Sequence, residues 1–161
     1  MTIQATKRAY TLGAEEGEAI WFAGTLTVLK AKGDQTQGRF ALLDQLVPGD
    51  YAVPRHLHHD EDEAWYLLDG EATFYCGDEQ FHVGRGGWVF LPQGVPHAFR
   101  AGPAGARLLV FSAPARFADF VCAAGEPAPS PTLPPPAPLD VERLAALASR
   151  YGIEILGPPP T

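Results

Sequence analysis

The sequence predicts an all-β protein built as a single barrel, and two observations carry that expectation. Short runs rich in β-branched and aromatic residues recur about every 8–12 residues between glycine and proline turns, which is typical of a sandwich or a closed barrel. Histidines fall on two of these runs at spacings that suit a shared interior site. At 161 residues, the chain has the length of one ordinary domain with a sizeable core.

The predicted barrel occupies residues 19–124, after a polar, aperiodic arm at residues 1–18. Besides the extended stretch that carries the first histidines, its strands are expected at 20–30, 39–47, 63–68, 71–76, 80–83, 88–91, 96–99 and 107–111. Hairpin turns are expected at Asp69-Gly70 and Gly77-Asp78, because each pair is flanked by apolar runs. Residues 117–124 are expected to form one or two helical turns.

A change in composition sets off the last part of the chain. Residues 125–138 are half proline, which favours extended polyproline II over pairing in a sheet, and the segment is long enough to cross the domain. Residues 139–161 follow as a C-terminal helix and tail, with Asp140 as the N-cap and Gly152 as the C-cap signal. This helix has an apolar stripe that can dock on its own barrel or across a dimer. We expect a homodimer, since the crossing segment offers a means of clasping a neighbour.

Composition also argues against several functions. The net charge of -7 and the scattered distribution of 12 Lys and Arg residues disfavour nucleic acid as a partner. No apolar run approaches the ~20 residues that a membrane span needs, and the first residues lack the apolar core of a signal peptide. We therefore expect a cytoplasmic protein with no membrane or nucleic-acid partner. Cys76 and Cys122 stand apart from any second ligand-type cluster, so a thiolate metal site is not expected.

Three histidines and one glutamate form a candidate metal site. His56 and His58 lie two residues apart on an extended stretch, so both rings project from one face. Glu63 follows on the next strand, and His97 opens a later strand after a proline and glycine turn. Three imidazoles and one carboxylate suit a first-row transition metal ion.

The other histidines and acidic residues nearby are expected on the surface. His59 and His82 fall in the acidic turn or alternate away from the interior, and the turn at residues 60–62 is interpreted as a solvated charged loop. Asp62 is the rival to Glu63 for the carboxylate role. Strand parity favours Glu63, because it shares a face with the apolar residue Trp65.

These positions resemble two sequence motifs of the cupin superfamily. The first, G-x5-H-x-H-x(3,4)-E-x6-G, is matched by His56, His58, Glu63 and Gly70, with Gly49 one residue further away than the pattern asks. The second, G-x5-P-x-G-x2-H-x3-N, is matched by Gly86, Pro92, Gly94 and His97, with Ala101 in place of the asparagine. The resemblance covers residues 40–112. It implies a jelly-roll barrel in which His56, His58, Glu63 and His97 hold one metal ion.

Within that superfamily, the chain resembles small bacterial single-domain proteins of the quercetin 2,3-dioxygenase-like group. The stretches WVFLPQGVPHAF and RYGIEILGPPP carry this resemblance. It implies that Glu63 also acts as the catalytic base on the substrate, and that dioxygen opens the central ring of a flavonol with release of carbon monoxide. The residue types accept Fe, Ni, Co, Mn, Cu or Zn as the divalent ion, and they leave the choice open.

A flat aromatic small molecule is the expected substrate, together with dioxygen. Trp65, Leu67 and Phe99 share strand faces with the metal ligands, and Phe90 and Trp88 are further candidates for the pocket; core packing is the alternative role for each. Two other functions stay open. One is a non-catalytic cupin that binds a small molecule, and the other is a sugar isomerase or epimerase that works without dioxygen.

Overall fold

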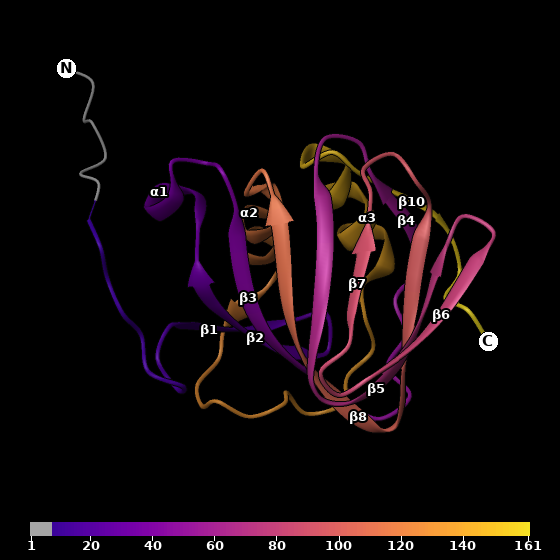
Figure 1. Cartoon of the computed structure of the whole chain (residues 1–161), viewed down its shortest axis with the longest axis horizontal. Helices are drawn as coiled ribbons and strands as arrows, with labels where there is room; N and C mark the ends of the chain where they lie inside the picture. The colour runs from indigo at the N-terminus through magenta and orange to yellow at the C-terminus, as the bar shows by residue number, and fades with distance from the viewer. Residues whose placement is uncertain (1–7) are drawn as a thin grey trace.

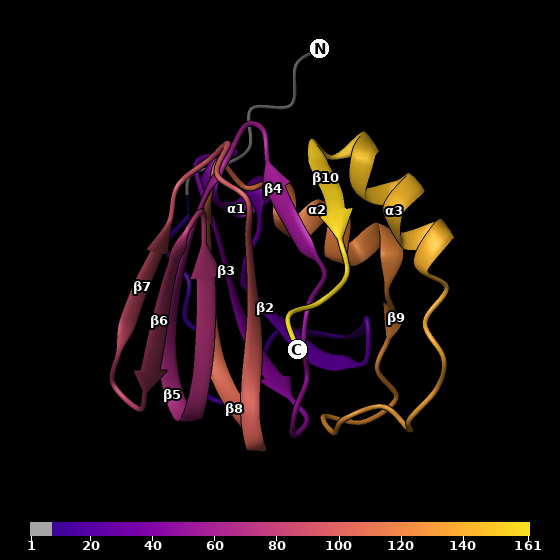
Figure 2. The same ribbon diagram turned by 90° about the vertical axis from the view of Figure 1, so that its right-hand side faces the viewer.

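The computed structural model of the chain describes residues 8–161, so the first part of the predicted N-terminal arm lies outside the described residues. Within residues 8–161, ten strands hydrogen-bond into one antiparallel sheet, which curls so that two of its parts face each other (Figures 1 and 2). Three short helices accompany it in the same range. The all-β prediction is therefore confirmed.

The path of hydrogen-bonded neighbours runs β10-β4-β8-β3-β2-β1-β9, and β5 joins it through β8 while also pairing with β6 and β7. The strands are β1 (Glu18–Phe22), β2 (Thr25–Ala31), β3 (Ala41–Val47), β4 (Arg55–His58), β5 (Asp62–Cys76), β6 (Glu79–Gly84), β7 (Trp88–Leu91), β8 (His97–Ala113), β9 (Glu126–Pro127) and β10 (Ile153–Gly157). The helices are α1 (Gly33–Thr36), α2 (Arg116–Ala124) and α3 (Val141–Arg150).

The prediction of a hairpin turn at Asp69-Gly70 is wrong, because these residues lie within the long strand β5. β5 continues through both residues and pairs with β8 on either side of a shift in register. Gly70 has a φ of 77°, and a Cβ there would run into the carbonyl oxygen of Gly105. The glycine therefore serves a bulge with close backbone approach rather than a turn. The hairpin at Gly77-Asp78 is present, joining β5 to β6.

The strand predicted at residues 20–30 is instead a hairpin of β1 and β2. Phe22 pairs with Thr25, which leaves Ala23 and Gly24 as a two-residue turn with φ values of 48° and 83°. Positive φ at both central positions is the requirement of the tight turns that match strand twist. The apolar run hides this turn, because only Gly24 signals it.

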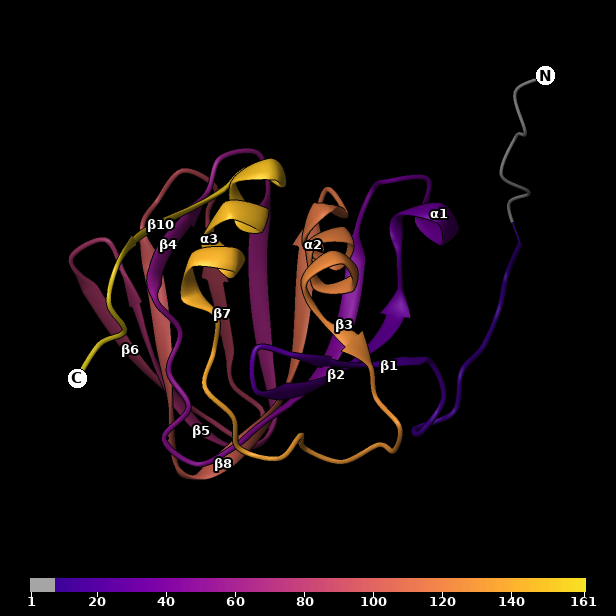
Figure 3. The same cartoon turned by 180° about the vertical axis from the view of Figure 1, so that it is seen from behind.

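The C-terminal part packs on its own barrel in this single chain, through contacts of α3 with β10 and α2. The proline-rich segment leaves β9 and runs along one end of the barrel to α3 (Figure 3). Its first residues do pair, since Pro127 lies opposite Ile20 of β1. Asp140 caps α3 by accepting a hydrogen bond from the Arg143 backbone. The tail then forms β10, which pairs with β4 and was not predicted. Within residues 8–161, no helix has the length and apolar character that crossing a bilayer requires.

Candidate metal centre

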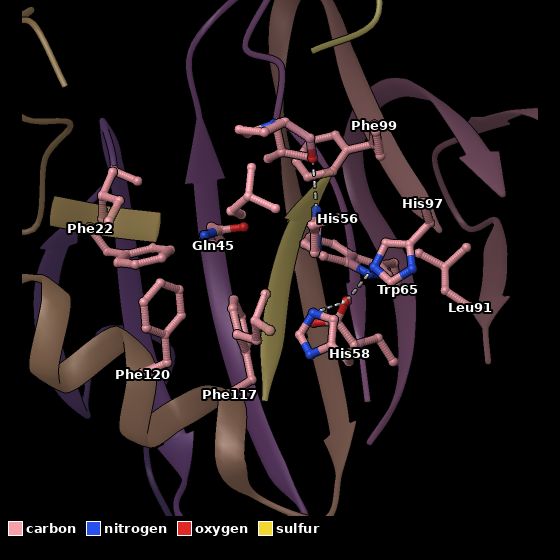
Figure 4. Close-up of a pocket in the computed structure, with 18 of the residues that line it drawn as sticks. Phe22, Gln45, His56, His58, Trp65, Leu91, His97, Phe99, Phe117 and Phe120 are labelled. Carbon is pink, nitrogen blue, oxygen red and sulfur yellow. Dashed lines mark hydrogen bonds and ion pairs between the residues drawn. The ribbon is translucent and has the colours of Figure 1, made fainter. Parts of the chain in front are cut away.

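Three strands bring the four predicted ligands together inside the barrel. His56 and His58 lie on β4, Glu63 lies on β5, and His97 opens β8 directly opposite His56. One ligand atom from each residue lies within 4.8 Å of the others (Figure 4). Glu63 Oε2 is 3.2 Å from His58 Nε2 and 3.1 Å from His97 Nε2. The cluster could therefore bind one metal ion.

Each histidine ring is held by a hydrogen bond on its outer nitrogen. In His56 and His97, Nδ1 lies 2.8 and 3.0 Å from the backbone carbonyl oxygen two residues earlier. In His58, Nδ1 lies 2.8 Å from the Glu61 carboxylate. A carbonyl can only accept, so Nδ1 of His56 and His97 carries a proton, and Nε2 is the nitrogen that faces the cluster. This is the ring orientation that a metal ion needs.

The buried polar atoms of the cluster fit a metal ion. Glu63 Oε1 is fully buried and has no hydrogen-bond partner within the described part of the chain. His58 Nε2 is equally buried, and it lies 3.2 Å from Glu63 Oε2 without a well-directed hydrogen bond. Buried polar atoms are normally paired, because leaving one unpaired costs about 1–3 kcal/mol. Nitrogen and carboxylate donors that converge in this way make up the ligand set of a transition metal ion.

The electrostatics of the cluster favour a positive charge. Burial opposes protonation of His58, but the Glu63 and Glu61 carboxylates outweigh burial and raise the pKa of His58 to about 10. Burial and the nearby His97 lower the pKa of His56 to about 3, so His56 is neutral. Burial alone would raise the pKa of Glu63, yet His58 and His97 hold it below its ordinary value. Glu63 is therefore ionised.

Glu61 is a candidate functional residue that sequence reasoning missed. The prediction of a solvated acidic turn is wrong for this residue, which is only 2% exposed. Its carboxylate accepts hydrogen bonds from His58 Nδ1 and, at 3.1 Å, from the Phe117 backbone amide at the start of α2. It thus orients a candidate ligand and ties it to the helix beside the cavity. Asp60 is exposed as predicted, and so are His59 and His82.

An apolar cavity of about 110 Å³ opens beside the cluster, several times the volume that one water molecule requires. Its aromatic lining comes from several elements: Phe22, Tyr51, Trp65, Phe99, Phe117 and Phe120. Figure 4 shows the histidines on one side of this cavity and Phe22 and Phe120 on the other. The C-terminal strand closes part of it through Ile153 and Ile155.

The structure divides the five predicted pocket residues. Trp65 and Phe99 line the cavity, whereas Leu67 is fully buried in the core and is not part of the lining. Trp88 and Phe90 do not line it, since they are 59% and 53% exposed on the outer face of the sheet. All four residues of β7 are apolar, so alternation could not show which pair faces inward.

A family model described as "Cupin domain" matches residues 42–112, the stretch that runs from β3 to β8 and includes all four candidate ligands. Among curated proteins, quercetin 2,3-dioxygenase of Bacillus subtilis (strain 168) is 29% identical over 154 residues, which cover 93% of this chain and 45% of that protein. The chain spans about half the length of the curated relatives it matches.

Solved structures share the fold at low sequence identity. An RmlC-like cupin from Shewanella frigidimarina NCIMB 400 superposes with a TM-score of 0.59 at 19% identity, covering 72% of this chain and all of that one. KdgF from Halomonas sp. superposes with a TM-score of 0.52 at 14% identity, covering 56% of this chain and 79% of that one. With its antiparallel barrel and its interior cluster of three histidines and a glutamate, the chain has the cupin fold and contains a cupin domain at residues 42–112.

Proposed function

We propose that this protein is a metal-dependent dioxygenase of the quercetinase type, which cleaves a flavonol or a related enolisable aromatic. The observation that carries the proposal is the convergence of His56, His58, Glu63 and His97 at one side of an aromatic-lined cavity. The similarity to a quercetin 2,3-dioxygenase across nearly the whole chain supports the same choice.

The four ligands would hold one divalent ion. His58 would lose its proton on binding, so that three neutral imidazoles and one carboxylate would leave the ion part of its positive charge. When bound, such an ion supplies a Lewis-acidic centre with coordination positions open to a ligand. The chain's own part is to keep the histidine rings oriented. The carbonyl oxygens behind His56 and His97 and the Glu61 carboxylate behind His58 do this.

Glu63 is the proposed base. Its carboxylate is ionised and lies within the cluster, so it can accept the proton of a flavonol hydroxyl that reaches the same place. Deprotonation makes the substrate electron-rich and therefore reactive toward dioxygen. The surrounding apolar walls exclude water, which would otherwise compete for the proton.

The chemistry of the cavity favours a flat aromatic ligand over a sugar. Rings from β1, β5, β8 and α2 line it, and the Phe117 and His58 rings pack edge to face with their centroids 5.8 Å apart. A sugar carries a hydroxyl on most of its carbons, and each buried hydroxyl needs a partner. Outside the metal cluster, the described lining offers few polar side chains, chiefly Gln45 and Tyr51. The isomerase alternative is therefore weaker.

The test is dioxygen consumption with quercetin by protein loaded with each candidate metal in turn. We expect dioxygen uptake matched by carbon monoxide release, and we expect Glu63→Gln to lose turnover. Trp88→Ser, on the outer face, is the matched aromatic control and keeps turnover. No uptake with any flavonol or 1,3-diketone overturns the proposal, and tight flavonol binding without uptake would identify a binding cupin instead.

A further inference from the structure

One polar side chain of the cavity lies outside the metal cluster and is oriented by its neighbours. Gln45 extends from β3 into the cavity and is only 3% exposed. Its amide nitrogen donates to Thr25 Oγ1 at 3.2 Å and to Thr27 Oγ1 at 3.1 Å, and both threonines are fully buried on β2. The two strands are paired, with Thr27 directly opposite Gln45.

The orientation of this amide follows from a chain of hydrogen bonds that ends at a backbone carbonyl. Thr25 donates its hydroxyl proton to the Phe22 carbonyl oxygen at 2.6 Å, and a carbonyl can only accept. With its proton committed, Thr25 Oγ1 can only accept from its other neighbours. The Gln45 atom that faces Thr25 must therefore be the NH2 group, which leaves Oε1 as the atom turned away.

Gln45 Oε1 then faces the cavity as a fixed acceptor. No described group donates a hydrogen bond to it, and Figure 4 shows the oxygen turned toward the side on which His56 lies. An acceptor fixed in the wall of an apolar cavity discriminates between ligands, because it favours one that brings a donor and penalises one that covers it without a donor.

We propose that Gln45 determines specificity by accepting a hydrogen bond from a hydroxyl group of the ligand, at a point separate from the metal centre. Under the proposed function, that hydroxyl belongs to a flavonol bearing hydroxyls besides the one that reaches the metal cluster. The choice of a flavonol as the ligand rests on the proposed function. The orientation of the Gln45 amide does not depend on the proposed function. Thr25 and Thr27 are positioning residues that hold the amide.

The test compares ligands that differ in hydroxyl groups, using anaerobic protein so that nothing is turned over. Quercetin and 3-hydroxyflavone share the 3-hydroxyl but differ in the remaining hydroxyls, and phenol and toluene form a second pair that is not flavonol. Dissociation constants come from absorbance for the flavonols and from NMR shifts for the small probes. The variants are Gln45→Met, which keeps the length of the side chain, and Thr27→Val, which removes one anchor. Gln80→Met, on the exposed face of β6, is the matched control.

We expect the wild type and Gln80→Met to prefer the hydroxylated member of a pair, and Gln45→Met to lose about threefold to tenfold of that preference. Thr27→Val should lose a smaller part, about twofold, because Thr25 still anchors the amide. Gln45→Met should not lower the affinity for 3-hydroxyflavone or toluene and should raise it if the unpaired acceptor penalises them, whereas a general packing defect would lower it. Thermal unfolding checks that each variant is folded. If Gln45→Met does not fold, the ligand preference of Thr27→Val tests the role of Gln45.

The two proposals fail differently. If the wild type binds neither flavonol, the proposed function fails, and the phenol and toluene pair still tests Gln45. If the wild type shows no preference within either pair, or if folded Gln45→Met and Thr27→Val keep the full preference, the role of Gln45 is overturned.

Discussion

Replacing Glu61 by glutamine should weaken metal binding although no candidate ligand changes. The Glu61 carboxylate accepts from two donors, His58 Nδ1 at 2.8 Å and the Phe117 backbone amide at 3.1 Å. A glutamine has the same shape but only one oxygen. Its NH2 group must then face one of these two positions.

Both orientations of the glutamine are unfavourable. If its oxygen stays with the Phe117 N–H, its NH2 faces His58 Nδ1, which must give up its proton and leave the proton on Nε2. An Nε2 that carries a proton cannot bind a metal ion. If its oxygen turns to His58, the NH2 meets the Phe117 N–H, and a buried donor without an acceptor costs about 1–3 kcal/mol. We expect Glu61→Gln to lower metal affinity by about 10- to 100-fold, which is about 1.4–2.8 kcal/mol.

The assay is a competition titration of Co²⁺ against a chromophoric chelator, with the visible spectrum of the bound ion reporting its coordination. Glu154→Gln is the matched control. Glu154 also lies 2.8 Å from a histidine, His59, but both side chains are exposed and neither belongs to the candidate metal cluster. The control should bind Co²⁺ as the wild type does. A Glu61→Gln variant that is folded and binds Co²⁺ within about twofold of wild type would refute the reasoning about the His58 tautomer.

Two further substitutions test the fold and the assignment of faces. In chemical denaturation, Gly70→Ala should lower the free energy of unfolding by at least about 2 kcal/mol more than Gly94→Ala does. Both glycines have positive φ, but only at Gly70 would a Cβ strike the Gly105 carbonyl. Equal losses of stability in the two variants would contradict the bulge. Trp88→Ser should leave the dissociation constants of the flavonols within about twofold of wild type in absorbance titrations, since Trp88 lies outside the cavity. A large loss of affinity would mean that the outer face takes part in binding.

The ligand cluster was predictable because it depends on short-range geometry. His56 and His58 share a face by strand alternation alone, and the parity of β5 selects Glu63 over Asp62. His97 is less local, since only the pairing of β4 with β8 brings it opposite His56. There the resemblance to a known pair of motifs supplied what periodicity could not.

The wrong predictions share one physical cause: the local sequence fits two structures equally well, and tertiary contacts select one of them. Gly70 follows an aspartate and looks like a turn, but the close approach of Gly105 makes it part of a bulge. Glu61 is chemically like the acidic residues beside it, and its burial depends on hydrogen bonds from His58 and from the α2 amide. Gln45 looks like a polar interruption in an apolar strand until β2 places two threonines beside it.

The metal content of the purified protein tests the central claim most directly. The measurement is elemental analysis of the wild type, as purified and after reconstitution, beside His56→Ala, with thermal unfolding to confirm that both are folded. The account predicts close to one first-row transition metal ion per chain in the wild type and loss of that metal in the variant. A wild-type protein that stays free of metal after reconstitution, or a folded variant that keeps a full equivalent, would contradict it.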